Sequence, residues 1–151
     1  MTATNHALTG AAIGLIIGQP LLAMPLALAS HFVCDAIPHF GFANPRKAIK
    51  SNTFRNYLIA ETFICAAIVA ALAWLHPVNW QLAAVCAFIA ASPDLLSINR
   101  YLSEIRGRQW RPSAYAKFAH GIQWFEKPIG AVVEVAWLIA IIVLVTPLII
   151  K

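Results

Sequence analysis

The residues with the clearest chemical potential lie in one short run of the chain. There His31, Asp35 and His39 stand four residues apart. At 100° per residue, a helix places three such side chains within about 80° of one face. Imidazole and carboxylate groups at this spacing predict a site for divalent metal. Because the outer two are roughly 12 Å apart along a helix, the pattern predicts either two ions or a kink at Pro38.

Most other ionisable groups of the apolar segments are expected on the same side of a membrane, because neighbouring segments run antiparallel and these groups lie at alternating segment ends. The full set is His6, His31, Asp35, His39, Glu61, Asp94, His120 and Glu134. We predict its histidines and aspartates as metal ligands. Glu61 and Glu134 lie a turn or two inside their segments, so we predict that they act as general bases or orient a histidine. His76 is expected in a turn on the opposite side.

The donor atoms of this set favour particular metals. Nitrogen and oxygen ligands without a convergent thiolate suit zinc, manganese or iron, and zinc is our first choice. More than four such ligands would suit a two-metal centre. The alternative is a structural role, in which the same residues form interhelical hydrogen bonds and ion pairs with loop arginines. Cys34, Cys65 and Cys86 match no paired-ligand spacing, and we predict that they are small core residues.

The elements that must position these residues are membrane helices. The chain has 151 residues, of which 60% are hydrophobic and only 11% charged, and its mean hydropathy is +0.72. Soluble domains carry roughly 25% charged residues. The composition and length therefore predict one integral membrane domain over residues 1–151 and make a soluble single domain the poorer interpretation.

Five apolar segments predict an all-α transmembrane bundle. They cover approximately residues 6–18, 20–38, 54–75, 80–91 and 128–150. The first and fourth are short for a crossing, and for the first two both a full crossing and a re-entrant hairpin stay open. The three glycines Gly10, Gly14 and Gly18 stand four apart and predict a close helix-packing face.

A basic and aromatic segment over 94–127 is expected to form an interfacial loop. Ten of the eleven lysines and arginines lie in or beside this loop and the one near residue 50, and Lys151 alone lies opposite. The positive-inside rule then predicts that both loops and the amino terminus face the cytoplasm. Anionic lipid headgroups are sufficient partners for the net charge of +5. No nucleic-acid partner is expected.

Three motifs carry a resemblance to a known family. They are Asn5-His6-Ala-Leu-Thr-Gly10, Ser30-His31-xxx-Asp35-xx-Pro38-His39 and Ser92-Pro93-Asp94. With them the sequence resembles the predicted membrane-bound metal-dependent hydrolases of bacteria and archaea, such as the YdjM-like inner-membrane proteins. Its HxxxD element is similar to that of zinc-dependent phospholipases C. The resemblance implies a zinc-dependent hydrolase of the prokaryotic inner membrane, and the ligands that it implies are His6, His31, Asp35, His39, Asp94 and His120.

The function predicted from these observations is hydrolysis of a lipidic or membrane-presented phosphoester or acyl substrate at the cytoplasmic face. Arg100, Arg106 and Arg111 are candidates, by charge and location, for holding a phosphate. The alternative is a non-catalytic protein that binds or transports a metal ion, another ion or a proton. The far half of the membrane segments holds essentially no polar residue, which favours a one-sided pocket over a path.

Overall fold

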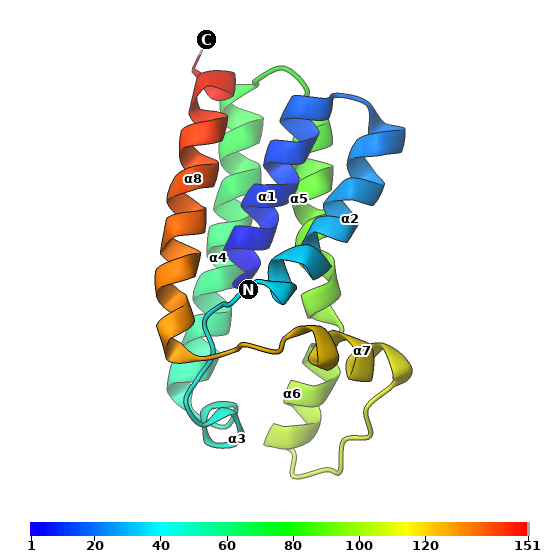
Figure 1. The fold of residues 1–151 in the computed structure, drawn as a ribbon, viewed down its shortest axis with the longest axis vertical. Helices are drawn as coiled ribbons and strands as arrows, with labels where there is room; N and C mark the ends of the chain where they lie inside the picture. Colours follow the sequence, from blue (N-terminus) through cyan, green and yellow to red (C-terminus); the bar gives the residue numbers. More distant parts are fainter. Residues whose placement is uncertain (151) are drawn as a thin grey trace.

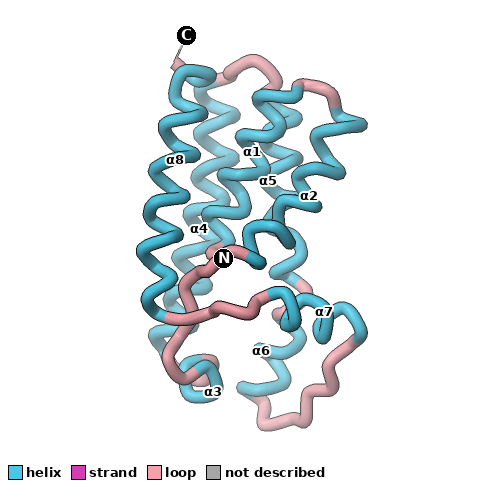
Figure 2. The backbone as a smooth tube through the Cα atoms, in the orientation of Figure 1, coloured by secondary structure: helices cyan, strands magenta, loops and turns pink. Residues whose placement is uncertain are grey.

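The computed structural model describes residues 1–150, with every side chain among them except that of Arg46. Lys151, the basic residue predicted on the far side, lies outside the described residues. The elements are α1 (Ala3–Ile17), α2 (Pro20–Ala36), α3 (Pro45–Ala48), α4 (Asn52–Leu75), α5 (Trp80–Leu95), α6 (Ile98–Ile105), α7 (Ala114–Ile122), a 3-10 turn (Pro128–Gly130) and α8 (Ala131–Ile149) (Figure 1). Within residues 1–150 the only strand-like pairing is an isolated bridge between His39 and Glu126 (Figure 2). The predicted all-α bundle is confirmed.

The five apolar segments form α1, α2, α4, α5 and α8, with boundaries that differ from the predicted ones by up to four residues. Helix α2 ends at Ala36, before Pro38, since a proline pushes the residue ahead of it out of the helical region. Helix α5 continues through Pro93 to Leu95, four residues beyond the predicted end. The predicted turn at residues 76–79 is confirmed, and both His76 and Asn79 adopt positive φ there.

Three helical stretches of the described chain are long and apolar enough to cross a membrane. They are Asn52–Leu75, Trp80–Ile105 and Pro128–Ile149. Helices α1 and α2 have 15 and 17 residues, so they extend only about 22 and 25 Å, whereas a hydrocarbon core is about 30 Å thick. The chain is therefore a membrane protein with three helices of spanning length rather than the five expected.

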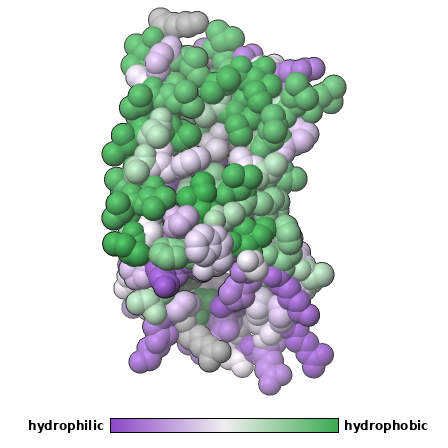
Figure 3. All heavy atoms as spheres, in the orientation of Figure 1, coloured by the Kyte–Doolittle hydropathy of each residue, from purple (hydrophilic) through white to green (hydrophobic). Residues whose placement is uncertain are grey.

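The predicted interfacial loop over 94–127 contains two short helices, α6 and α7. Cation–π contacts link its basic and aromatic residues: the Arg100 guanidinium lies 5.4 Å from the centre of the Trp110 ring, and the Lys127 ammonium lies 5.1 Å from that of Phe125. Figure 3 shows the hydrophilic residues gathered at this end of the molecule, while hydrophobic residues dominate the rest of the visible face.

Helix α1 is central, because it contacts α2, α4, α5 and α8. A Cβ atom added to Gly14 would lie 2.5 Å from the Cα atom of Ala83, and one on Gly10 would collide with the carbonyl oxygen of Cys86. Both glycines therefore allow α1 and α5 to approach closely, as predicted. Gly18 ends α1 with a φ of +64°, and a Cβ atom added there would lie 2.7 Å from the side-chain nitrogen of Asn79, the residue before α5.

Candidate metal centre

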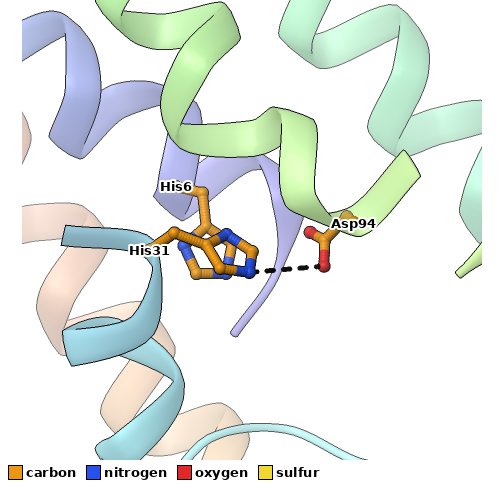
Figure 4. A group of neighbouring side chains, drawn as sticks. All are labelled: His6, His31 and Asp94. Atoms are coloured by element: carbon orange, nitrogen blue, oxygen red, sulfur yellow. Dashed lines mark ion pairs between the residues drawn. The ribbon is translucent and has the colours of Figure 1, made fainter. Parts of the chain in front are cut away.

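Three helices bring His6, His31 and Asp94 together. Each offers one nitrogen or oxygen atom of a kind that binds metals, and these atoms lie within 4.8 Å of one another (Figure 4). His6 is on α1, His31 on α2 and Asp94 near the end of α5. Both histidines are buried, whereas the Asp94 side chain is 37% exposed. The group is thus enclosed by the bundle and accessible on the aspartate side.

The hydrogen bonds of His31 fix which of its nitrogens can bind a cation. Its Nδ1 lies 2.8 Å from the carbonyl oxygen of Ala90 and must donate to it, because a carbonyl only accepts. Its Nε2 faces two carboxylates, with Asp35 Oδ2 at 3.4 Å and Asp94 Oδ1 at 4.0 Å. A bare lone pair and two negative charges repel one another, so this geometry calls for a proton or a metal ion between them.

The ring of His6 leaves one nitrogen without a partner. Its Nε2 lies 3.1 Å from Asp35 Oδ1, whereas its Nδ1 has no hydrogen-bond partner among the described residues and is fully buried. A buried polar atom left unpaired destabilises a protein by about 1–3 kcal/mol. The rings of His6 and His31 are stacked, with centroids 4.1 Å apart. The stacking holds the two rings beside each other, and the unpaired Nδ1 is left able to accept a proton or a cation.

Asp35 contacts both histidines from α2. It accepts hydrogen bonds from His6 and from Gln123 Nε2, the latter at 2.8 Å, and it lies against the amino group of Met1. A carboxylate bonded to a metal-ligating histidine fixes the orientation of the ring. The structure therefore places Asp35 beside the group of three, as a partner of its histidines. Its own ligand role stays a prediction.

The other two predicted histidine ligands lie apart from this group. Because α2 ends at Ala36, the helical-face argument was wrong for His39. Its ring is buried, and its Nδ1 donates to the carbonyl oxygen of Ile37 at 2.8 Å. His120 is exposed on α7. In residues 1–150 the one group of at least three metal-binding side chains contains neither histidine.

The two glutamates hold the amino end of α1. Glu61 Oε2 accepts the backbone N–H of Thr4 at 2.8 Å, and Glu134 Oε2 accepts that of Thr2 at 3.2 Å. Glu134 also accepts the side-chain amide of Asn5 and the N–H of Phe40. First-turn N–H groups lack helical partners, and negative charge is favourable at this end of a helix. Both glutamates thus position the helix that carries His6, and their role as general bases stays a prediction.

Three hydrogen bonds near the ends of α2 and α5, close to the metal group in sequence, were not predicted from the sequence. Besides the Gln123 bond, Trp124 Nε1 donates to the carbonyl oxygen of Ala36 at 2.7 Å, and the Tyr115 hydroxyl donates to that of Pro93 at 3.4 Å. Burial, with the negative charges of Asp94 and Asp35, raises the pKa of Tyr115, so it stays a donor. No residue spacing indicates such contacts. They fasten α7 and the residues after it to the ends of α2 and α5.

The geometry fits one metal ion. Ligand atoms about 2.1 Å from a tetrahedral zinc lie roughly 3.4 Å apart. His31 Nε2 and Asp94 Oδ1 are 4.0 Å apart, so this pair must approach by about 0.6 Å when an ion binds. The fold and this group define a helical membrane protein with a candidate metal centre. No family model matches the chain, and comparison with curated proteins and with solved structures finds no match either. The resemblance to membrane-bound hydrolases therefore stays a prediction.

Proposed function

We propose that the protein is a membrane-embedded, metal-dependent hydrolase that binds one divalent ion, zinc by first choice, through His6, His31 and Asp94. The observation that carries the proposal is the convergence of three ligand atoms, from three helices, within 4.8 Å. The Nε2 of His31, which faces two carboxylates, supports a cation at this place. Two nitrogens and one oxygen match the ligands of catalytic zinc sites, which keep a position open for water or substrate.

In this proposal the chain's own residues prepare the site. Asp35 holds the ring of His6, and the Ala90 carbonyl holds the ring of His31 with Nε2 directed at Asp94. A divalent ion bound there would supply Lewis-acid activation of water and of the ester group. The partly exposed Asp94 marks the side from which a substrate reaches the group.

The proposed substrate is a lipid or a molecule presented at the membrane surface, cleaved at a phosphoester or acyl bond. The group lies where helix α5 reaches Asp94, the first residue of the basic and aromatic segment 94–127, so a headgroup at this depth keeps its chains in the bilayer. We further propose that the protein resides in a prokaryotic inner membrane with this end in the cytoplasm. The basic residues of this end suit anionic headgroups.

The alternative of a transported ion or proton has less support. A cavity in the far half of the bundle, between α1, α4 and α8, is lined only by apolar side chains. They are Leu8, Ala11, Leu15, Ile68, Ala71, Leu72, Leu75, Val145 and Ile149. An ion that crossed the membrane through this cavity would meet no polar side chain from the residues that line it. The cavity therefore favours a site that opens on one side only.

The first experiment measures metal content by mass spectrometry after purification in detergent without chelator. Wild type should hold one equivalent of zinc, and His31→Ala and Asp94→Ala should lose it. His120→Ala and His76→Ala are matched controls and should keep it, since both histidines are exposed and lie outside the group. Metal-free wild type, or equal loss in the controls, would refute the site.

The second experiment tests hydrolysis. Zinc-loaded wild type is screened against phosphoester and acyl lipids in mixed micelles, with the His31→Ala variant beside it. Turnover should fall at least 100-fold in the variant, because three-ligand catalytic sites depend on every ligand. Turnover that persists unchanged in a folded, zinc-free variant would show that the hydrolysis belongs to a contaminant or to another site.

A further inference from the structure

A second cavity of the bundle lies between α1, α4 and α5. Its volume is about 170 Å³, and one residue of α1, three of α4 and two of α5 line it. These residues are Ala7, Cys65, Ala66, Val69, Ala87 and Phe88. Helices α4 and α5 belong to stretches of membrane-spanning length, so this cavity, which we call the α4–α5 groove, is in the apolar part of the molecule.

The α4–α5 groove shares helices α1 and α5 with the metal group. Its α1 residue, Ala7, directly follows His6. On α5, Ala87, Ala91 and Asp94 are spaced four and three apart, which places them on one face of the helix. The distance along this face from Asp94 to Ala87 is about 10 Å. The groove thus continues the face that carries the exposed ligand and leads from it toward the middle of the membrane.

The lining of the groove selects an apolar, flexible occupant. Two alanines on its inner side, Ala7 and Ala87, are buried in the bundle and leave room because their side chains are small. Phe88 is 63% exposed and Val69 is 37% exposed, so the outer side is turned away from the protein core. On a spanning helix this outer side faces lipid chains.

We propose that the α4–α5 groove binds one acyl chain of a lipid substrate and thereby places the bond next to the headgroup at the metal group. The inference rests on the proposed function, because it specifies the substrate of that same site. The other apolar cavity has no lining residue from α5, the helix of Asp94, and so it does not connect to the exposed ligand in this way. An acyl chain is the occupant that a membrane supplies and that purely apolar walls accept.

The test uses the full chain in nanodiscs with a phosphatidylglycerol that carries a diazirine in one acyl chain. Light attaches the bound lipid, and peptide mass spectrometry locates it. In wild type we expect saturable labelling of residues 65–69 and 87–88, which an excess of unlabelled lipid suppresses. Ala66→Trp and Val69→Trp fill the groove with an indole and should reduce the labelling about tenfold.

Ala67→Trp is the matched control, because Ala67 is exposed on the same helix and lines neither cavity. It should label like wild type. Equal labelling of Ala66→Trp and wild type would refute acyl-chain binding in the groove. The same loss of labelling in Ala67→Trp as in Ala66→Trp would refute it too. Zinc is measured on the same samples, so the two proposals fail separately: metal-free wild type that still labels saturably refutes the hydrolase site alone. Zinc-bound wild type without saturable labelling refutes the groove alone.

Discussion

The two sides of the bundle are built differently. Helices α1, α2 and α5 pack closely through small residues, and the buried alanines at their contacts are Ala7, Ala11, Ala12, Ala23, Ala27, Ala83, Ala87 and Ala90. Among the described residues, α4 buries only Leu72, and α8 buries only Glu134, Ile141 and Val145. The outer faces of these two long helices carry large exposed apolar side chains such as Phe63 and Val143.

This difference separates the tasks of the helices. The three residues of the metal group all come from the closely packed side, where small residues fix the backbones relative to one another. A site needs its ligands held within about 0.5 Å, which rigid helices provide better than loops. The longer α4 and α8 supply membrane length and, through Glu61 and Glu134, the contacts that hold α1 in place.

The largest expected effect comes from a branched side chain at the closest helix contact. Gly10→Val would drive its Cβ into the backbone carbonyl of Cys86, so α1 and α5 must separate. We expect a loss of at least about 3 kcal/mol of stability, together with loss of zinc. Thermal unfolding in detergent, followed by circular dichroism, measures the first and mass spectrometry the second. Gly121→Val is the control, since a Cβ there meets nothing within 4 Å among the described residues. Wild-type behaviour of Gly10→Val would contradict the close packing.

The next effect concerns the carboxylate behind the ligands. Asp35→Asn keeps the size of the side chain but removes the charge that faces His6 and His31. We expect the affinity for zinc to fall about 10–100-fold, as when partners of metal-ligating histidines are lost elsewhere. Competition with a fluorescent zinc chelator measures it. Glu104→Gln on α6, which changes the net charge equally, should leave the affinity unchanged. An unchanged affinity in Asp35→Asn would show that this carboxylate does not support the ligands.

The sequence predicts the helices well because an apolar run of the right length has few alternatives in a membrane. It also predicts that His6, His31 and Asp94 share one end, because antiparallel segments bring alternate ends together. It fails for His39, whose place depends on where α2 ends before Pro38. It also does not show that Glu61 and Glu134 accept hydrogen bonds from backbone N–H groups, because a glutamate serves catalysis and helix ends equally.

A smaller effect is expected where the outer helices hold α1. Glu134→Gln removes the charge that accepts hydrogen bonds from the backbone N–H groups of Thr2 and Phe40, and we expect about 1–2 kcal/mol less stability. Glu61→Gln alters one hydrogen bond among the described residues, from the N–H of Thr4, and should destabilise less. Thermal unfolding of both variants and of wild type shows which substitution lowers the stability more. A larger effect of Glu61→Gln would mean that α4, rather than α8, positions the first turn of α1.

The smallest effect is expected on the outer face of α8. Val143 is 67% exposed, and in a bilayer its methyl groups meet lipid chains that are as apolar as a protein interior. Val143→Ala should therefore change stability by less than about 0.5 kcal/mol, whereas Ile141→Ala, on the buried face of the same helix, should lose about 2 kcal/mol or more. Chemical unfolding in the same detergent compares the two variants directly. A loss of more than about 1 kcal/mol of stability in Val143→Ala would mean that protein covers this face of α8. Lipid chains refill the space of the two lost methyl groups, whereas a rigid protein neighbour leaves a cavity.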